Sequence, residues 1–179
     1  MEWRSRIRIL PAAPDQLALV AEVLDDASRR LLALGISQWP IPFPVDKVIF
    51  PGTGATVYLA WDGDVAAGTF TLQRRDPAFW PDMGEAAGGL EAWGRDGTRP
   101  VYLHRFATRS GYRGLGTLMY SEAEAIARGW GANVMRLDCV ASDAKIRAYY
   151  EAFGYESRGD ITPPHLTFPA ARYEKPLAR

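Results

Sequence analysis

The sequence contains few of the residues that build disulfides and metal centres, and no run that could span a membrane. Cys139 is the only cysteine, so no internal disulfide can form. His104 and His165 are the only histidines, and with one cysteine they form no metal-ligand spacing, so we expect no metal site. No apolar run reaches the roughly 20 residues of a membrane helix, and no apolar signal segment follows the first four residues. These absences predict a cytoplasmic protein that does not contact a membrane.

The charges of the chain are balanced. Lysine plus arginine and aspartate plus glutamate number 21 each, so no net field favours nucleic acid or an anionic membrane. Arg105, Arg109 and Arg113 nevertheless surround one loop, either as a solvated edge or as a site that attracts an anion. With 179 residues the chain can bury about 70% of its unfolded surface, so we expect a single domain over residues 1–179.

The most informative segment is residues 109–117, which read Arg-Ser-Gly-Tyr-Arg-Gly-Leu-Gly-Thr. It lies between an apolar run at 101–108 and an amphipathic run at 115–130, a spacing that predicts a strand, a glycine loop and the start of a helix. Backbone N–H groups and the helix dipole can bind an anion there, and glycines let the backbone approach it closely. The segment therefore predicts a phosphorylated ligand.

Two common nucleotide loops do not fit this segment. A P-loop requires Gly-Lys-Ser or Gly-Lys-Thr, which the chain lacks. A dinucleotide loop requires a third glycine after Gly114 and Gly116, where Met119 stands, although Asp138 lies about 20 positions further on. The segment also follows several predicted strands instead of opening a βαβ unit. Neither nucleotide-binding class is therefore favoured.

The loop resembles the acyl-CoA loop of the Gcn5-related N-acetyltransferase (GNAT) family, Q/R-x-x-G-x-G/A. Residues 111–116 align with it, with both glycines matched and Gly111 at the first position. Downstream, residues 143–155 resemble the family pattern N-x-x-A-x-x-x-Y-[E]-x-x-G-F, with Asp143 for Asn and Tyr155 for Phe. The resemblance covers about residues 5–175, and its specific motifs lie between 101 and 155.

Hydrophobic periodicity and turn residues predict alternating elements. The expected strands are 7–10, 57–61, 65–73, 101–108, 134–140, 155–159 and 167–174, and the expected helices are 14–34, 115–130 and 142–153. This order is mixed α/β. The family resemblance implies a GNAT-type mixed twisted sheet with splayed central parallel strands flanked by helices.

The resemblance also implies acetyl-CoA (coenzyme A) as cofactor. In the family, the strand at 106–108 offers backbone groups to the pantetheine arm, and residues 112–117 bind the pyrophosphate. The cofactor-binding residues expected on this basis are Phe106, Ala107, Thr108, Arg109, Tyr112, Arg113, Gly114, Leu115, Gly116, Thr117, Asp143 and Tyr150.

Two side chains are candidates for proton transfer. Tyr150 aligns with the family tyrosine that protonates the leaving thiolate, and its apolar helix face equally fits a core aromatic. His104 is the candidate base, because an imidazole titrates near neutral pH, which predicts a kcat/KM inflection at roughly 6–7.5. It fits equally a structural strand histidine, and a water relay without any dedicated base stays open. Cys139 is expected to be a buried, inert thiol, and Asp138 to orient a polar group or cap a helix.

Two segments, 35–54 and 74–100, carry aromatic residues that could line an acceptor site. The candidates are Trp39, Phe43, Phe50 and Trp80. The second segment, with a short helix expected near 83–93, is alternatively a surface loop or a homodimer contact.

The sequence thus predicts an N-acetyltransferase that transfers an acetyl group from acetyl-CoA to a primary amine of a small molecule by direct attack. Two alternatives stay open. One is a catalytically silent acyl-CoA-binding protein. The other is an N-acetyltransferase that acts on a protein or peptide.

Overall fold

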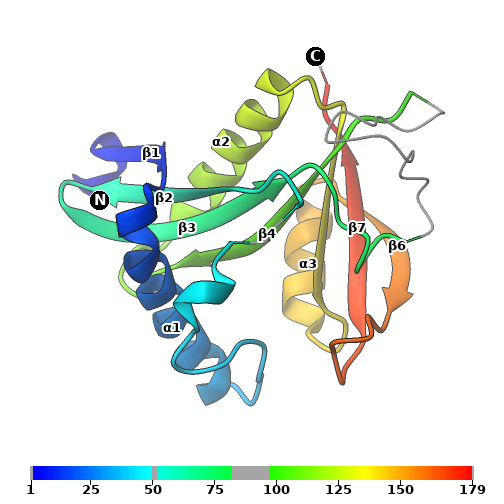
Figure 1. Cartoon of the computed structure of the whole chain (residues 1–179), viewed down its shortest axis with the longest axis horizontal. Helices are drawn as coiled ribbons and strands as arrows, with labels where there is room; N and C mark the ends of the chain where they lie inside the picture. Colours follow the sequence, from blue (N-terminus) through cyan, green and yellow to red (C-terminus); the bar gives the residue numbers. More distant parts are fainter. Residues whose placement is uncertain (1, 50–51, 82–96, 179) are drawn as a thin grey trace. The chain divides into compact units, whose positions relative to one another are not determined.

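The computed structural model describes residues 2–49, 52–81 and 97–178. The described strands are β1 (Ile7–Pro11), β2 (Thr56–Asp62), β3 (Val65–Gln73), β4 (Pro100–Thr108), β5 (Val134–Val140), β6 (Glu156–Ile161) and β7 (Ala170–Pro176) (Figure 1). The described helices are α1 (Leu17–Ala33), α2 (Leu115–Gly129) and α3 (Ala144–Ala152), with short 3-10 turns η1 (Glu2–Ser5), η2 (Pro14–Gln16) and η3 (Val45–Lys47).

The strands form one sheet in the order β1-β2-β3-β4-β5-β7-β6. β4 and β5 are parallel, whereas β1–β2, β2–β3, β5–β7 and β6–β7 are antiparallel. The parallel register runs from Pro100 opposite Val134 to Leu103 opposite Leu137. A mixed sheet flanked by helices confirms the predicted fold class.

The chain divides into two compact units. Unit 1 comprises Met1–Leu72 and Arg105–Ala123, and unit 2 comprises Gln73–His104 and Glu124–Arg179. The division falls within β4, beside Arg105, whose φ of 50° is left-handed. A left-handed residue interrupts the extended backbone of β4 at this point. For a non-glycine residue that conformation costs about 1–2 kcal/mol. The single domain expected from the sequence stays a prediction.

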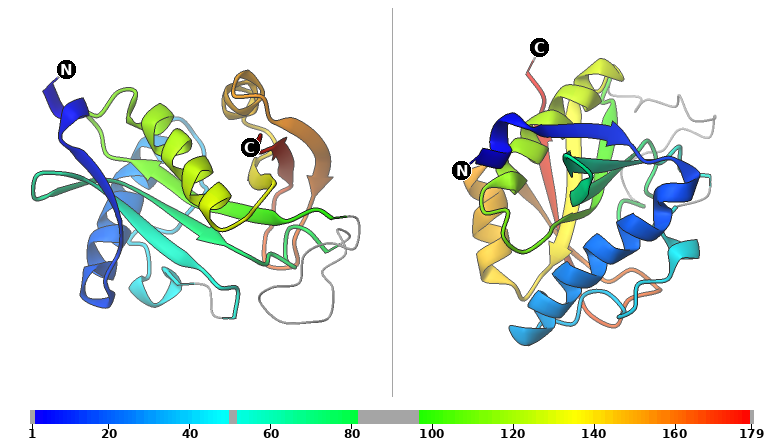
Figure 2. Two further views of the ribbon diagram at one scale, coloured as in Figure 1. Left: turned by 90° about the horizontal axis from the view of Figure 1, so that it is seen from above. Right: turned by 90° about the vertical axis from the view of Figure 1, so that its left-hand side faces the viewer.

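Unit 1 packs α1 against the β2–β3 hairpin, which Figure 2 shows as a long pair of strands. Val20, Val23, Leu24 and Ala27 recur at helical spacing and are buried, as an amphipathic helix requires. The position of Gly68 on β3 leaves little room for a side chain, because an added Cβ would lie 2.6 Å from the Met119 sulfur. This glycine therefore lets α2 approach β3 closely.

Unit 2 has β5 at its centre, paired on one side with β4 and on the other with β7. Its helix α3 begins after Asp143, whose carboxylate accepts hydrogen bonds from Lys145 N and Ile146 N. This is a standard N-cap, since the first N–H groups of a helix have no partner within it. Cys139 is buried, as expected from the sequence, and burial raises the pKa of its thiol to about 12, which disfavours the reactive thiolate.

Most predicted elements match within a few residues. The two last strands begin later than expected, at Glu156 and Ala170, and prolines at 163, 164 and 169 precede the second of them, where they cannot donate to a ladder. The helix expected near 83–93 falls outside the described residues. Within the described ranges, every helix is too short or too polar to cross a membrane.

Candidate active site

A loop with two left-handed glycines joins β4 to α2 in unit 1, as the sequence predicts (Figure 2). Gly111 and Gly114 both have φ of 90°, which only glycine adopts readily. Leu115 N donates to Tyr112 O at 3.0 Å and closes the turn before the helix. The first-turn amides of α2 lack helical partners and lie at the positive end of its dipole. The loop therefore has the backbone geometry of an anion site.

The side chains of the loop differ in whether they are paired, exposed or buried. Arg109 Nε donates to Ala66 O at 2.8 Å and its Nη2 lies 3.0 Å from Glu22, so the guanidinium is already paired within unit 1. Arg113 and Thr117 are exposed, whereas the Leu115 side chain is fully buried and leaves only its backbone to the loop. Contact of these residues with a cofactor stays a prediction, and for Arg109 the pairing indicates a positioning role.

Helix α1 holds the start of the loop. The Asp26 carboxylate accepts hydrogen bonds from Ser110 N at 2.9 Å and Ser110 Oγ at 3.1 Å. Arg30, which pairs with Asp26 at 3.2 Å, donates to Thr108 O. The backbone from Thr108 to Ser110 is therefore fixed by one acid and one base of α1.

The N-terminal turn η1 reaches the other end of the loop. The Trp3 ring packs edge-on against Tyr112 with centroids 5.7 Å apart. Arg4 is exposed, and its Nη2 lies 3.0 Å from the position that a Cβ on Gly114 would take. Arg4 could not be predicted from the sequence, because more than 100 residues separate it from the glycine motif and no local pattern links them.

The predicted strand residues before the loop are largely packed. Phe106 lies against Tyr120, with ring centroids 4.3 Å apart, and Ala107 is buried in the unit 1 core. Thr108 is half-buried. Their proposed backbone contacts with a cofactor stay predictions.

A buried charged cluster in unit 2 surrounds His104. The β4–β5 register ends with Leu103 opposite Leu137, and His104 and Asp138 are the next residues on the two strands. Their side chains meet, with His104 Nδ1 3.3 Å from Asp138 Oδ1. On the other side of the ring, His104 Nε2 lies 3.1 Å from Asp76 Oδ2.

The turn after β3 fixes the second carboxylate. Asp76 Oδ1 accepts a hydrogen bond from Phe79 N at 3.3 Å, and Asp76 O accepts one from Trp80 N at 2.9 Å. Phe79 in turn lies 5.8 Å from the His104 ring and 5.5 Å from the His165 ring, centroid to centroid. Both histidines of the chain thus contact one phenylalanine. No local sequence pattern links Asp76 or Phe79 to His104.

The carboxylates change the titration of His104. Burial lowers the pKa of the imidazole, but hydrogen bonds and charge from Asp138 and Asp76 outweigh it and raise the pKa to about 10. Burial also raises the pKa of Asp138, which the hydrogen bond and the positive charge of His104 oppose. His104 is therefore an imidazolium at neutral pH. Its catalytic role stays a prediction, but the expected inflection at 6–7.5 does not follow from this environment.

Asp76, His104 and Asp138 are also candidate metal ligands, because their donor atoms lie within 4.8 Å of one another. The two carboxylates face opposite nitrogens of one ring, and an imidazole offers an ion only one of them. This geometry fits a doubly protonated imidazolium better than a metal centre.

Tyr150 lies on α3 and is buried within an aromatic group in unit 2. Its ring is 5.9 Å from Tyr173 and 6.1 Å from Tyr155, centroid to centroid. This packing agrees with the core alternative, and proton donation by the Tyr150 hydroxyl stays a prediction. The Asp143 side chain caps α3, so its predicted cofactor contact is also untested.

The aromatic acceptor candidates lie in different surroundings. In unit 1, Phe43 is buried in the core and Trp39 is half-buried against it. In unit 2, Trp80 is fully buried, with the guanidinium carbons of Arg136 and Arg172 at 4.8 and 5.3 Å from its ring. Phe50 falls outside the described residues. Trp80 therefore has a packing role in unit 2, and the acceptor role of these residues stays a prediction.

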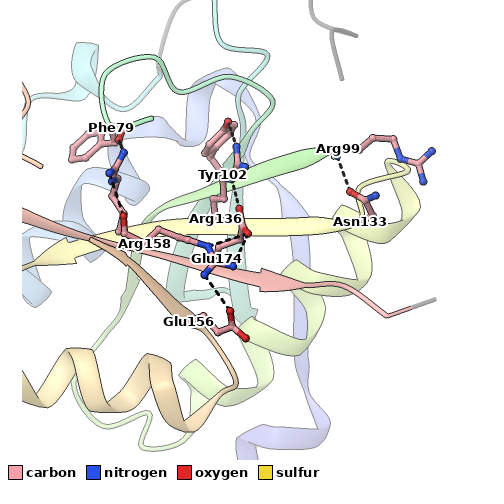
Figure 3. A network of polar contacts seen from close by, with 9 residues as sticks. Phe79, Arg99, Tyr102, Asn133, Arg136, Glu156, Arg158 and Glu174 are labelled. Carbon is pink, nitrogen blue, oxygen red and sulfur yellow. Dashed lines mark hydrogen bonds and ion pairs between the residues drawn. The ribbon is translucent and has the colours of Figure 1, made fainter. Parts of the chain in front are cut away.

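A second polar row crosses the sheet of unit 2. Figure 3 shows Tyr102, Arg136, Glu174 and Arg158 joined by hydrogen bonds. Arg136 Nε donates to Glu174 Oε2 at 2.8 Å, and only 3% of the Arg136 side chain is exposed. On β4 and β5, Tyr102 and Arg136 lie two residues before His104 and Asp138. Side chains two residues apart on a strand project to the same face of the sheet, so that face carries both polar groups.

The sequence comparisons agree with the loop geometry. The sequence model of the acetyltransferase (GNAT) family matches residues 35–155. The chain belongs to the GNAT acetyltransferase family. The uncharacterized N-acetyltransferase YesJ of Bacillus subtilis is 37% identical over 78 residues, which are 41% of this chain and 43% of that protein. The match thus spans less than half the length of this curated relative.

Solved GNAT structures share the fold over nearly the whole chain. An acetyltransferase from Listeria monocytogenes superposes with a TM-score of 0.69 at 20% identity, over 96% of this chain and 95% of that one. YncA from Salmonella typhimurium, solved with its cofactor acetyl-CoA, superposes with a TM-score of 0.62 at 14% identity, over 97% and 95%. At these identities the likeness establishes the fold of this GNAT member.

Proposed function

We propose that this chain is an N-acetyltransferase that transfers an acetyl group from acetyl-CoA to a primary amine of a small molecule. The glycine loop at the start of α2 is the observation that carries the proposal. Its left-handed glycines and first-turn amides suit a phosphate ligand, and they occur at the acyl-CoA motif of a family of acetyltransferases.

Residues of the chain supply the remaining chemistry. Acetyl-CoA provides an activated thioester carbonyl when bound. Amides of residues 112–117 hold its phosphates, and Arg4 and Arg113 add positive charge near them. The Tyr150 hydroxyl gives a proton to the departing thiolate. The cluster of His104, Asp76 and Asp138 accepts the proton that the amine releases. General acid and base steps of this kind each contribute about 10²–10⁴-fold to the rate.

A small, partly apolar amine is the acceptor that the surroundings of His104 favour. Phe79 lies beside both histidines, and the carboxylates of Asp76 and Asp138 attract an ammonium group. Trp39 is proposed as an additional aromatic contact. Since Trp80 is buried, Trp39→Ala is the cleaner test, and it should raise the KM for the amine without weakening acetyl-CoA binding.

The first experiment measures the thermal shift caused by acetyl-CoA. At 100 times the dissociation constant, ligand binding should stabilise the protein by about 2.7 kcal/mol. Gly116→Asp should abolish this shift, because it sets a negative charge where phosphate binds. The substitution itself suits a helix N-terminus, so the protein should stay folded. The control Gly129→Asp, at an exposed position at the end of α2 where an added Cβ meets nothing within 4 Å, should keep the shift.

The second experiment measures thiol release with a panel of primary amines. Turnover of small amines supports the proposal. Saturable acetyl-CoA binding without turnover would instead identify a silent acyl-CoA-binding protein, and turnover of peptides alone would identify a protein or peptide N-acetyltransferase.

A further inference from the structure

We propose that Asp138 accepts the proton of the attacking amine, and that His104 and Asp76 are positioning residues that hold Asp138 in place. The inference rests on the proposed function and assigns its proton acceptor. It departs from the simplest reading of the sequence, in which His104 itself is the base.

The first support is that a carboxylate lies against each nitrogen of the His104 ring. Both nitrogens of His104 lie within 3.3 Å of a carboxylate oxygen, Asp138 on one side and Asp76 on the other. Two carboxylates on opposite sides of one imidazole favour its doubly protonated cation, because both negative charges then face a positive ring. A ring in that state has no lone pair with which to accept a proton. The geometry therefore assigns His104 the role of a buried cation.

The second support is the charge of the cluster. Two carboxylates and one imidazolium leave one excess negative charge in a buried site, where burial penalises it. A proton that arrives at the cluster is accepted by a carboxylate oxygen. Of the three side chains Asp138 is the most exposed, at 16%, compared with 8% for His104 and 4% for Asp76. Asp138 is thus the member that an amine can reach.

The other charged groups around Asp138 come from three elements. Arg172 on β7 is its cross-strand partner, with its guanidinium donating to Phe79 O and Arg158 O. His165, in the loop between β6 and β7, lowers the pKa of Asp138 by its charge, whereas Asp76 raises it. The larger influences are burial, which raises this pKa, and His104, which lowers it.

The proton balance is simple. An acceptor that arrives as an ammonium group first gives one proton to water. The neutral amine then forms the new N–C bond, the C–S bond breaks, and the second proton lost by the amine nitrogen moves to a carboxylate oxygen of Asp138. The thiolate takes a separate proton from Tyr150. Asp138 then returns its proton to water, and Tyr150 regains one from water.

The first arm of the test compares pH profiles of kcat/KM for wild type, Asp138→Asn and His104→Gln. Wild type should gain activity with rising pH as Asp138 ionises. Asp138→Asn should lose this inflection and about 10²–10⁴-fold in rate. His104→Gln should keep the inflection but move it to higher pH, because the cation that lowers the pKa of Asp138 is gone. A positioning residue shifts the profile, whereas loss of the base removes it.

The second arm observes His104 without reference to activity. His165→Gln leaves His104 as the only histidine of the chain, so its imidazole ¹⁵N signals can be assigned directly by NMR. The ring should stay doubly protonated through neutral pH and titrate near pH 10. Asp138→Asn and Asp76→Asn in this background should each lower that midpoint.

Three results would overturn the inference. They are a His104 titration near its ordinary value of about 6.5, wild-type kinetics in Asp138→Asn, and loss of the inflection in His104→Gln with its retention in Asp138→Asn. In each case transfer by the wild-type protein would leave the proposed function standing. Acetyl-CoA binding without any amine turnover would refute the proposed function and this inference with it.

Discussion

The two units carry their candidate functional groups in opposite ways. Unit 1 offers backbone amides of an exposed glycine loop, and its supporting ion pair is largely solvated, with Arg109 28% and Glu22 59% exposed. Unit 2 buries its charges, with Arg136 3% and His104 8% exposed. A solvated pair contributes little to stability, whereas a buried charge that loses its partner costs several kcal/mol. Changes in unit 1 should therefore affect ligand binding, and changes in unit 2 should affect stability and pH dependence.

The largest expected effect on stability is that of Glu174→Gln in unit 2. Glu174 accepts hydrogen bonds from Arg136 at 2.8 Å and Arg158 at 3.1 Å. Removal of its charge leaves the Arg136 guanidinium buried without an anion, which should cost about 3–5 kcal/mol. Denaturant unfolding followed by circular dichroism measures the loss.

The matched control is Glu22→Gln in unit 1. It removes a charge of the same kind from the exposed pair with Arg109, and should cost less than about 1 kcal/mol. Similar losses of unfolding free energy in the two variants would show that the contrast between the units has no energetic consequence.

Tyr150→Phe is expected to have the next largest effect. The ring contacts with Tyr155 and Tyr173 remain, so stability should change little, but the phenolic proton is lost. Turnover should fall by roughly 10–10³-fold with unchanged acetyl-CoA binding. The control Tyr149→Phe removes the hydroxyl of the adjacent half-buried tyrosine and should keep full activity. If Tyr150→Phe keeps full turnover, its hydroxyl takes no part in the reaction.

Local patterns in the sequence were sufficient to predict most of the fold. The stripe of Val20, Val23, Leu24 and Ala27 predicts a helix buried on one face, and that helix forms. The glycine loop was found for the same reason, since Gly111 to Gly116 are close in sequence and their spacing carries the geometry. The start of the last helix was misplaced by two residues, because Asp143 serves as its cap and Ser142 does not.

The charged cluster could not be predicted in the same way. Asp138 and His104 meet because Leu103 pairs with Leu137, and a sequence does not state the register of two strands whose paired residues lie 34 positions apart. Asp76 comes from a turn whose path depends on its own hydrogen bonds to Phe79 and Trp80. The acidity of a candidate base is therefore the property that sequence reasoning is least able to supply.

The smallest expected effect is that of Arg4→Ala in unit 1. Arg4 Nη2 lies 3.0 Å from the position that a Cβ on Gly114 would take, so its charge lies beside the proposed phosphate site. An exposed ionic contact of about 0.2–1 kcal/mol corresponds to a weakening of acetyl-CoA binding by roughly 1.4- to 5-fold. The control Arg8→Ala, on the exposed side of β1, should leave binding unchanged. Isothermal titration at two salt concentrations adds a second criterion, because a lost phosphate contact also reduces the salt dependence of the dissociation constant. Equal affinities and equal salt dependence in Arg4→Ala and wild type would confine Arg4 to its packing on Trp3, and the phosphate site of unit 1 would then be built by the loop alone.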